Sequence, residues 1–367
     1  MAAARAKAVQ RSLQVIKMLA ETTGSTGKQL RREVAEIVFT VSNIRAVLRH
    51  APAAHVGLRR LGAEVLTRLA MDADARERIG GTGGVVALLL DMFLRPGGGS
   101  SDEDADAARV EAGEALAMLA LESPRNCERI LRGGGGSSSL ATTSTTTTTT
   151  TVDSLVDALG DAAIGVEAGR ILTNLCAYTG GSSEWFPQLR RATRGAATVL
   201  RDVAATVNES KPLEVSLGLA AQLVRLMGPH ELAHHLVSAG VTEADLVSRL
   251  VSVLATYACP SIKAPRIRRF TVELVVALLR TPPARERWLI AEAMAAAGMG
   301  AELRRVAETT SELECFHVFS GSAGVSRHAV GLAALVDTAL ELMGTTVAGA
   351  DRAPRVSVTT TDKCACV

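Results

Sequence analysis

The chain has 367 residues, of which 47% are hydrophobic and only 3% are aromatic. This content excludes a disordered polyampholyte, and the shortage of aromatic residues favours closely packed small helices over a sheet sandwich. The net charge is only +2, which argues against binding of a polyanion along the whole chain. At ~150 residues per domain the length suggests roughly two domains, unless the chain is built from repeats.

The first 20 residues contain apolar residues at helical spacing, which predicts an ordinary helix. Arg5, Lys7, Arg11 and Lys17 interrupt any secretory apolar segment. The same stretch lacks acidic residues, which is also a feature of transit peptides. Organelle import therefore stays open as the alternative to a first helix.

Residues 1–50 carry nine basic and three acidic residues, a charge of +6. One interpretation is a surface for an anionic partner or a membrane, and the preferred one is the solvated outer face of two helices. No aromatic residue lies among these basic residues before Phe39. Base stacking is therefore unsupported, and we expect no nucleic-acid partner.

Two short motifs resemble sites of chemistry only in part. Gly24-Ser25-Thr26-Gly27-Lys28 lacks both ends of a phosphate-binding loop, because Thr22 and Gln29 stand where Gly and Ser or Thr are needed. The segment 320–324 lacks the first glycine of a nucleophile elbow. Both are interpreted as turns or caps, so we expect no small-molecule substrate and no cofactor.

The strongest signal is an internal repeat. Five segments combine small residues with apolar residues at i, i+3 and i+4, which predicts a buried helical stripe that a neighbouring helix approaches closely. Their aligned apolar residues follow one another at steps of 50, 56, 51 and 52. These residues are Leu66, Leu116, Leu172, Leu223 and Val275, in segments 62–70, 112–120, 168–176, 219–227 and 271–279.

A second pattern follows three of these helices. Arg76-Glu77-Arg78-Ile79, Cys127-Glu128-Arg129-Ile130 and Arg285-Glu286-Arg287-Trp288 each come after a polar break. A glycine-rich turn over 80–84 then leads into an apolar helix over 85–94. The order resembles the armadillo repeat, and the match is closest over residues 62–90. The resemblance implies an all-α, armadillo-like right-handed α-solenoid.

The period exceeds the ~40–47 residues of that family, so loops must be inserted. Residues 96–106 are glycine-rich and then acidic, and residues 133–151 are runs of Gly, Ser and Thr. Such segments cannot bury enough apolar area to offset their ordering entropy, and we expect disordered surface loops. We expect the repeat domain over 1–343 and a flexible tail over 344–367, where helical periodicity is lost.

The segment 310–316, with Phe319-Ser320-Gly321 and Ser326-Arg327-His328 after it, is similar to a group of plant armadillo-repeat proteins. Longer members of that group carry membrane segments ahead of the repeats. No apolar run here reaches the ~18 residues of a membrane span. The resemblance supplies no catalytic residue, so we expect a non-enzymatic protein in the cytoplasm.

The armadillo resemblance implies a concave groove that binds extended protein segments through the third helix of each repeat. The nuclear-import type uses an Asn ladder two positions after the aligned apolar residue, and only one residue here matches, so import-receptor function is not expected. Arg68 and Arg225 are candidates to pair with partner carboxylates or phosphates. The predicted groove positions are Arg68, Met118, Asn174 and Arg225, with Ala277 in the fifth repeat.

The segment His230-Glu231-Leu232-Ala233-His234 matches His-Glu-x-x-His, in which two histidines on one helix face bind zinc and the glutamate acts as a base. Catalytic zinc needs a third protein ligand. Gly240 stands where a metzincin has histidine, and residues 246–272 contain no carboxylate. A surface helix is the leading interpretation; a zinc hydrolase using His230 and His234 is the remote alternative.

Cysteines are dispersed rather than paired. Cys127, Cys176, Cys259 and Cys315 fall in or beside apolar patterns, which is typical of reduced core residues. The end, Cys364-Ala365-Cys366-Val367, has the form of a prenylation motif with unusual last residues. Lipidation at Cys364 or Cys366 would tether the chain to a membrane, which is the second function hypothesis beside an interaction scaffold; an inert tail is the simpler interpretation.

Overall fold

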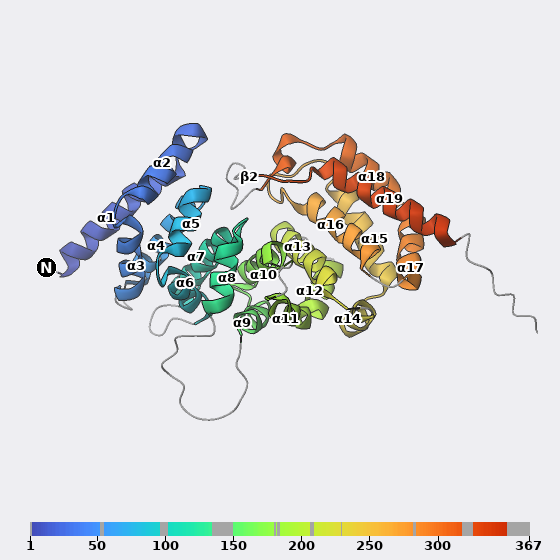
Figure 1. Ribbon diagram of the computed structural model, residues 1–367, viewed down its shortest axis with the longest axis horizontal. Helices are drawn as coiled ribbons and strands as arrows, with labels where there is room; N and C mark the ends of the chain where they lie inside the picture. Colours follow the sequence, from blue (N-terminus) through green and yellow to red (C-terminus); the bar gives the residue numbers. More distant parts are fainter. Residues whose placement is uncertain are drawn as a thin grey trace, which may run out of the picture.

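The computed structural model describes residues 2–51, 55–95, 102–133, 150–179, 181, 184–205, 209–228, 230–281, 284–317 and 326–350. These residues form stacked helices and a single two-stranded antiparallel sheet. Figure 1 shows the helices arranged as an arch, with α1 and α19 at its two ends. The predicted all-α solenoid is therefore confirmed.

Within the described ranges, seven helices form the inner row of the arch, and each contacts the next along the row. Six of them close a three-helix unit, and the first precedes all units. They are α1 (Ala2–Glu21), α4 (Val56–Leu69), α7 (Asp102–Ala120), α10 (Gly165–Thr179), α13 (Ser210–Leu226), α16 (Ile267–Arg280) and α19 (Leu332–Ala350).

The other helices complete the units on the outer side. The first helices are α2 (Gly24–Glu36), α5 (Ala73–Gly81), α8 (Pro124–Gly133), α11 (Phe186–Arg190) with the 3-10 helix η2 (Arg191–Gly195), α14 (Glu231–Ala239) and α17 (Ala284–Ala296). The second helices are α3 (Thr40–His50), α6 (Val85–Leu94), α9 (Thr151–Ala158), α12 (Ala196–Ala204), α15 (Glu243–Thr256) and α18 (Met299–Glu308).

All five repeated segments lie in the inner row, in α4, α7, α10, α13 and α16. The second pattern lies in α5, α8 and α17, and the helix expected over 85–94 is α6. In the first instance of this pattern the arginine has a structural role, because buried Arg76 donates hydrogen bonds to the carbonyls of Ala70 and Leu121. It thereby joins the ends of α4 and α7, whose last carbonyls lack helical partners.

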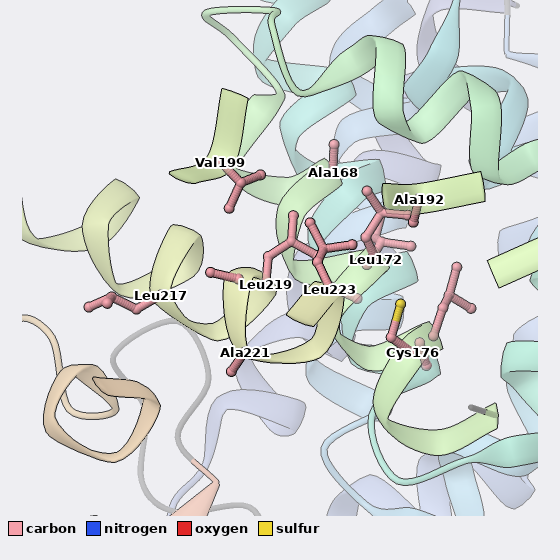
Figure 2. Close-up of a cluster of buried hydrophobic side chains, with 14 of the residues drawn as sticks. Ala168, Leu172, Cys176, Ala192, Val199, Leu217, Leu219, Ala221 and Leu223 are labelled. Atoms are coloured by element: carbon pink, nitrogen blue, oxygen red, sulfur yellow. The ribbon is translucent and has the colours of Figure 1, made fainter. Parts of the chain in front are cut away.

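Small residues set the spacing of the inner row. A Cβ atom added at Gly113 would lie 2.6 Å from the Cβ of Glu167, and one at Gly169 would lie 2.7 Å from a methyl group of Val215. Each glycine therefore marks a place where the next inner helix packs directly on the backbone. Figure 2 shows the resulting core around α10 and α13, with Leu172 and Leu223 among the buried side chains.

Helix starts follow local capping chemistry. Thr242 and Asp245 form a capping box at α15, and the Asp72 side chain accepts two backbone N–H groups of α5. Gly84 precedes α6 with φ of 85°, a conformation that side chains disfavour. These signals end one helix and start the next within a few residues.

The expected loop and tail boundaries need correction. Helix α7 already begins at Asp102, so 102–106 is helical: acidic residues favour a helix N-terminus. Thr151 begins α9, after Thr150 and Asp153 form a capping box. Helix α19 continues to Ala350, beyond the expected boundary at 343. Residues 96–101, 134–149 and 351–367 lie outside the described residues.

The last unit contains an insertion between its second and third helices. It starts with the 3-10 helix η3 (Glu312–Cys315), followed by β1 (Phe316–His317) and β2 (Ser326–Arg327). The strands pair Phe316 with Arg327 and His317 with Ser326. We call residues 312–317 and 326–331 the C-terminal hairpin. In Figure 1, β2 lies in the opening of the arch, between the N-terminal arm, formed by α1 to α5, and the C-terminal arm, formed by α15 to α19.

Among the helices of the described residues, none has the length and apolar content to cross a membrane.

Candidate interaction groove

The predicted groove residues do not share one exposed row. Arg225 is exposed on α13, and Arg68 is partly exposed on α4, with its Nε atom 3.6 Å from a carboxylate oxygen of Glu21. Asn174 is half-buried, and its Nδ2 donates to the carbonyl of Ala117 over 2.8 Å. This hydrogen bond joins α10 to α7, so Asn174 is engaged within the solenoid.

Met118 and Ala277 are corrections to the predicted groove. Met118 is 0% exposed and Ala277 is 1% exposed, so neither side chain can touch a partner. The cause is packing on several sides. Helices α7 and α16 each contact two inner and at least two outer helices, so the aligned apolar residue and the residue two positions later are both buried, whereas Arg225 of α13 is exposed.

A different repeat position carries charge along the inner row. Two residues before the aligned apolar residue stand Glu64, Glu114, Arg170 and Glu273, all of them partly or largely buried, and the fourth repeat has buried Ala221 there. Arg170 lies 3.6 Å from a carboxylate oxygen of Glu114 on the preceding inner helix. This charged column was visible in the repeat alignment as a position where charge interrupts the apolar pattern.

The acidic part of this column gathers between α4 and α7. Lys17 of α1 pairs with Glu64, and Lys211 of α13 reaches to 4.0 Å from Glu114. Glu111, one helical turn before Glu114, lies beside both glutamates. Burial, with the charges of Glu114 and Glu64, raises the pKa of Glu111 to about 7. Arg60 and Arg68 act in the opposite direction, and burial is the largest cause of the raised pKa.

Arg68 lines a cleft of about 600 Å³ in the N-terminal arm. The cleft lies between the α1–α2 turn, α4 and α5, and Glu122 and Ser326 form part of its wall. Charges of both signs line the cleft. The basic residues are Lys28, Arg31, Arg32, Arg68 and Arg76, and the acidic residues are Glu21, Asp72, Asp74 and Glu122.

Asn174 lines a much smaller cavity at the centre of the inner row. Its volume of about 20 Å³ is room for roughly one water molecule. Leu121 of the α7–α8 turn, Arg170 of α10 and Arg266 of α16 surround it, together with His317 of the C-terminal hairpin. The hairpin therefore reaches the same cavity as Asn174, the one predicted Asn of the groove.

Several basic residues of the N-terminal arm have partners within the fold. Arg32 pairs with Asp74, and Arg31 donates to the carbonyls of Ala20 and Thr22. Arg45 donates to the carbonyl of Gly83 over 2.9 Å. The Arg31 contacts join α2 to the end of α1, and those of Arg32 and Arg45 join the first unit to the second, which supports the preferred interpretation of the basic stretch as helix faces.

The His-Glu-x-x-His interpretation is wrong in its geometry. His230 precedes α14 with φ of 69°, so it does not stand one helical turn before His234. The carboxylate of Glu231 accepts the backbone N–H of Gly228 over 2.8 Å and pairs with Arg190, which lowers its pKa. Among the described residues, no group of three or more His, Cys, Asp or Glu side chains could hold a metal ion.

The remaining motifs are structural where they are described. Gly24-Ser25-Thr26-Gly27-Lys28 forms the start of α2 and follows the helix α1. A phosphate-binding loop follows a strand instead. Burial of Cys176 raises the pKa of its thiol to about 12, so this cysteine is an inert core residue. Cys364 and Cys366 lie outside the described residues, as does the segment 320–324.

Comparison with known proteins finds similar solved structures at low sequence identity. No family model and no curated protein matches the sequence. An engineered protein solved by the Northeast Structural Genomics Consortium is 18% identical, with a TM-score of 0.52 over 83% of this chain and 97% of the other. A designed armadillo repeat protein is 13% identical, with a TM-score of 0.43 over 90% and 99%. With its stacked three-helix units, the chain has an armadillo-like solenoid fold.

Proposed function

We propose that this chain is a non-enzymatic interaction scaffold, which binds an extended segment of a protein partner along the inner row of helices. The observation that carries the proposal is the charged column, which places Glu64, Glu114 and Arg170 at one repeat position of the consecutive inner helices α4, α7 and α10. Glu273 stands at the same position of α16, and Ala221 interrupts the column in α13. An extended peptide presents side chains at regular intervals, so a periodic row of charges is a suitable receptor. The solenoid supplies that periodicity without any catalytic group.

The charges favour a basic residue in the partner segment between α4 and α7. Glu64 and Glu114 already have cations nearby, whereas burial and these two carboxylates raise the pKa of Glu111. A lysine or arginine of the partner would stabilise the charged form of Glu111 and lower that pKa again. The nearby cleft beside Arg68 would accommodate the flanking residues of the same segment.

The test is affinity purification from native tissue with identification of co-purifying proteins by mass spectrometry. The wild type is compared with Arg68→Glu, Arg225→Glu, and with the charge-matched control Arg125→Glu, Arg285→Glu, whose residues are exposed on the outer helices α8 and α17. We expect a stoichiometric partner that the control retains and the groove variant loses. Equal recovery with all three proteins would remove Arg68 and Arg225 from the binding surface.

A second candidate function is a tethered adaptor of the cytoplasmic membrane surface, supported by the Cys364-Ala365-Cys366-Val367 sequence. The plant-like group with longer, membrane-anchored members motivates the same proposal. Replacing Cys364 and Cys366 by Ser should release the chain into the soluble fraction, because stable anchoring generally takes two lipid signals. A wild-type chain that is already soluble in tissue would contradict this candidate.

A further inference from the structure

The C-terminal hairpin is fixed at its base to the C-terminal arm. Arg268 of α16 makes a bidentate contact with Glu314, with distances of 2.7 and 2.6 Å, and both side chains are only 1% exposed. Its Nη1 also donates to the carbonyl of Ala258. On the returning strand side, Arg269 donates to the carbonyl of Val330 over 2.8 Å. The hairpin therefore leaves the last unit in a defined direction.

Its far end reaches a residue about two hundred positions earlier in the chain. The hydroxyl of Ser326 donates to one carboxylate oxygen of Glu122, and Nε2 of His317 lies 3.2 Å from the other. The rings of His317 and His328 lie against each other, with centroids 3.7 Å apart. Glu122 thus receives two side chains of the hairpin, one from each strand.

Glu122 itself stands in an unusual backbone conformation. Its φ is 51°, in the left-handed region that glycine normally occupies just after a helix ends, as it does here after α7. A side chain in this conformation is strained relative to glycine. Glycine would end the helix with less strain, so we take the contacts of the Glu122 carboxylate with the hairpin as the feature that distinguishes this residue.

The hairpin occupies positions that a partner segment would need. His317 covers the cavity beside Asn174 and Arg170, and Ser326 forms part of the wall of the cleft beside Arg68. An extended segment running along the inner row from the cleft to α13 would meet the hairpin halfway. The contacts at Glu122 are hydrogen bonds of exposed or half-buried groups, which a competing segment can replace.

We propose that the C-terminal hairpin is an intramolecular ligand of the inner row, held at Glu122, and that it competes with the protein partner for the centre of the groove. This inference rests on the proposed scaffold function. The hairpin is the bound form of an autoinhibitory segment, and the buried Arg268–Glu314 pair keeps it attached when its far end is released.

The test uses the full chain and a fluorescent synthetic peptide with the sequence of residues 312–331, added in trans. In Ser326→Glu the groove is intact, but the new carboxylate faces Glu122 and repels it. We expect the backbone amides of 326–331 to exchange hydrogen at least about tenfold faster in this variant. We expect the peptide to bind it at least about tenfold more tightly than it binds the wild type, whose own hairpin occupies the site.

Two variants complete the design. Ser238→Glu adds the same charge on α14, where the Ser238 hydroxyl donates to His234, and it should behave like the wild type. Adding Glu122→Gly to Ser326→Glu should abolish peptide binding while sparing the repeats, because glycine suits this backbone. Slow exchange in Ser326→Glu, or fast exchange without peptide binding, would overturn the proposal.

Partner capture separates this inference from the proposed function. If Ser326→Glu recovers more partner than the wild type, the hairpin inhibits the groove. Equal recovery by both proteins would refute competition and leave the scaffold function intact. If neither protein recovers a partner while the peptide still binds Ser326→Glu, the scaffold function fails and the hairpin stands as a ligand of its own chain, without the competition proposed here.

Discussion

Each arm of the arch contains an ion pair between an arginine and a carboxylate, but the pair is exposed in the N-terminal arm and buried in the C-terminal arm. In the N-terminal arm, Arg32 and Asp74 pair across units with side chains that are 53% and 56% exposed. In the C-terminal arm, Arg268 and Glu314 are 1% exposed and bidentate. Exposed pairs contribute little because water and salt screen them, whereas removing one member of a buried pair leaves a charge without its partner. The C-terminal arm is therefore the one held by its ion pair.

The largest effect is expected from Glu314→Ala. This change leaves the Arg268 guanidinium buried without its carboxylate, so we expect a loss of ~3–5 kcal/mol in the free energy of unfolding. Chemical denaturation followed by circular dichroism measures it. Glu312→Ala, two residues earlier on the same 3-10 helix and exposed, is the control and should change stability by less than ~0.5 kcal/mol. Equal losses in both variants would end the contrast between the arms.

The second prediction concerns the units between the arms. In Gly113→Ala the added methyl group would stand 2.6 Å from Glu167 Cβ and 2.7 Å from the Phe93 ring. We expect destabilisation of ~1–3 kcal/mol from overpacking. Gly57→Ala in α4 meets no atom within 4 Å and should be neutral or gain up to ~1 kcal/mol of helix propensity. Thermal unfolding of both variants measures the difference, and a neutral Gly113→Ala would show that α7 and α10 can move apart.

The third prediction concerns the attachment of the hairpin to the other arm. Burial, with the charges of His317 and Arg269, lowers the pKa of His328 to about 3, while Glu122 opposes this and Arg266 adds to it. The folded pKa is depressed, so neutral His328 favours the closed hairpin above pH ~6.5, and this contribution is lost as the pH falls toward 3.

Hydrogen exchange of the segment 326–331 measures this dependence, after correction for intrinsic rates. We expect the opening equilibrium to rise about tenfold between pH 7 and pH 5. Contacts of Glu122, whose pKa is held at about 2 chiefly by His317, persist over this range. His328→Gln should flatten the profile, and an unchanged profile in that variant would assign the pH dependence to another group.

The fourth prediction concerns Glu111, in the inner row between the N-terminal arm and the centre. Its folded pKa is raised to about 7, so the folded state binds a proton more tightly than the unfolded state does. Stability should therefore fall as the pH rises from about 4.5 to 7. Glu111→Gln should gain about 1 kcal/mol at pH 8, after allowance for solvent screening, and little at pH 4. A Glu111→Gln variant without this gain would mean that a cation already neutralises the site.

The smallest effect is expected from Arg32→Ala in the N-terminal arm. Its ion pair with Asp74 is exposed, so we expect a change below ~0.5 kcal/mol that shrinks further in 1 M salt. Equilibrium unfolding at low and high salt measures both. A loss above ~2 kcal/mol would mean that the exposed pair of the N-terminal arm contributes to stability about as much as the buried pair of the C-terminal arm.

The repeat architecture could be predicted because it depends on local patterns. Small residues and apolar spacing around Leu66, Leu116 and Leu172 define the inner helices, and the glycines within them are where neighbours pack. The boundaries at 102 and 350 were less predictable, because acidic or small polar residues occur both in loops and at helix ends. The groove prediction failed at Met118 because α7 packs against α4, α6, α8 and α10, so that opposite faces of this helix, which carry Leu116 and Met118, are both buried.

The contacts of the hairpin could not be predicted from the sequence. The segment 310–316 was recognised only as a resemblance, and nothing in it indicates that Glu314 meets Arg268 or that Ser326 meets Glu122. These pairs join residues 46 and 204 positions apart, so their encounter depends on the curvature of the whole arch. A residue such as Glu122, which takes positive φ without being glycine, is visible only in three dimensions.

The contact between Ser326 and Glu122 also bears on how the chain unfolds. Units of a solenoid touch only their neighbours, so such chains can lose structure from either end, one unit at a time. A link that spans 204 residues couples the second unit to the last one. Fraying of the C-terminal units must then break a long-range closure as well as a local interface, which increases the cooperativity of a molecule whose architecture otherwise favours stepwise melting.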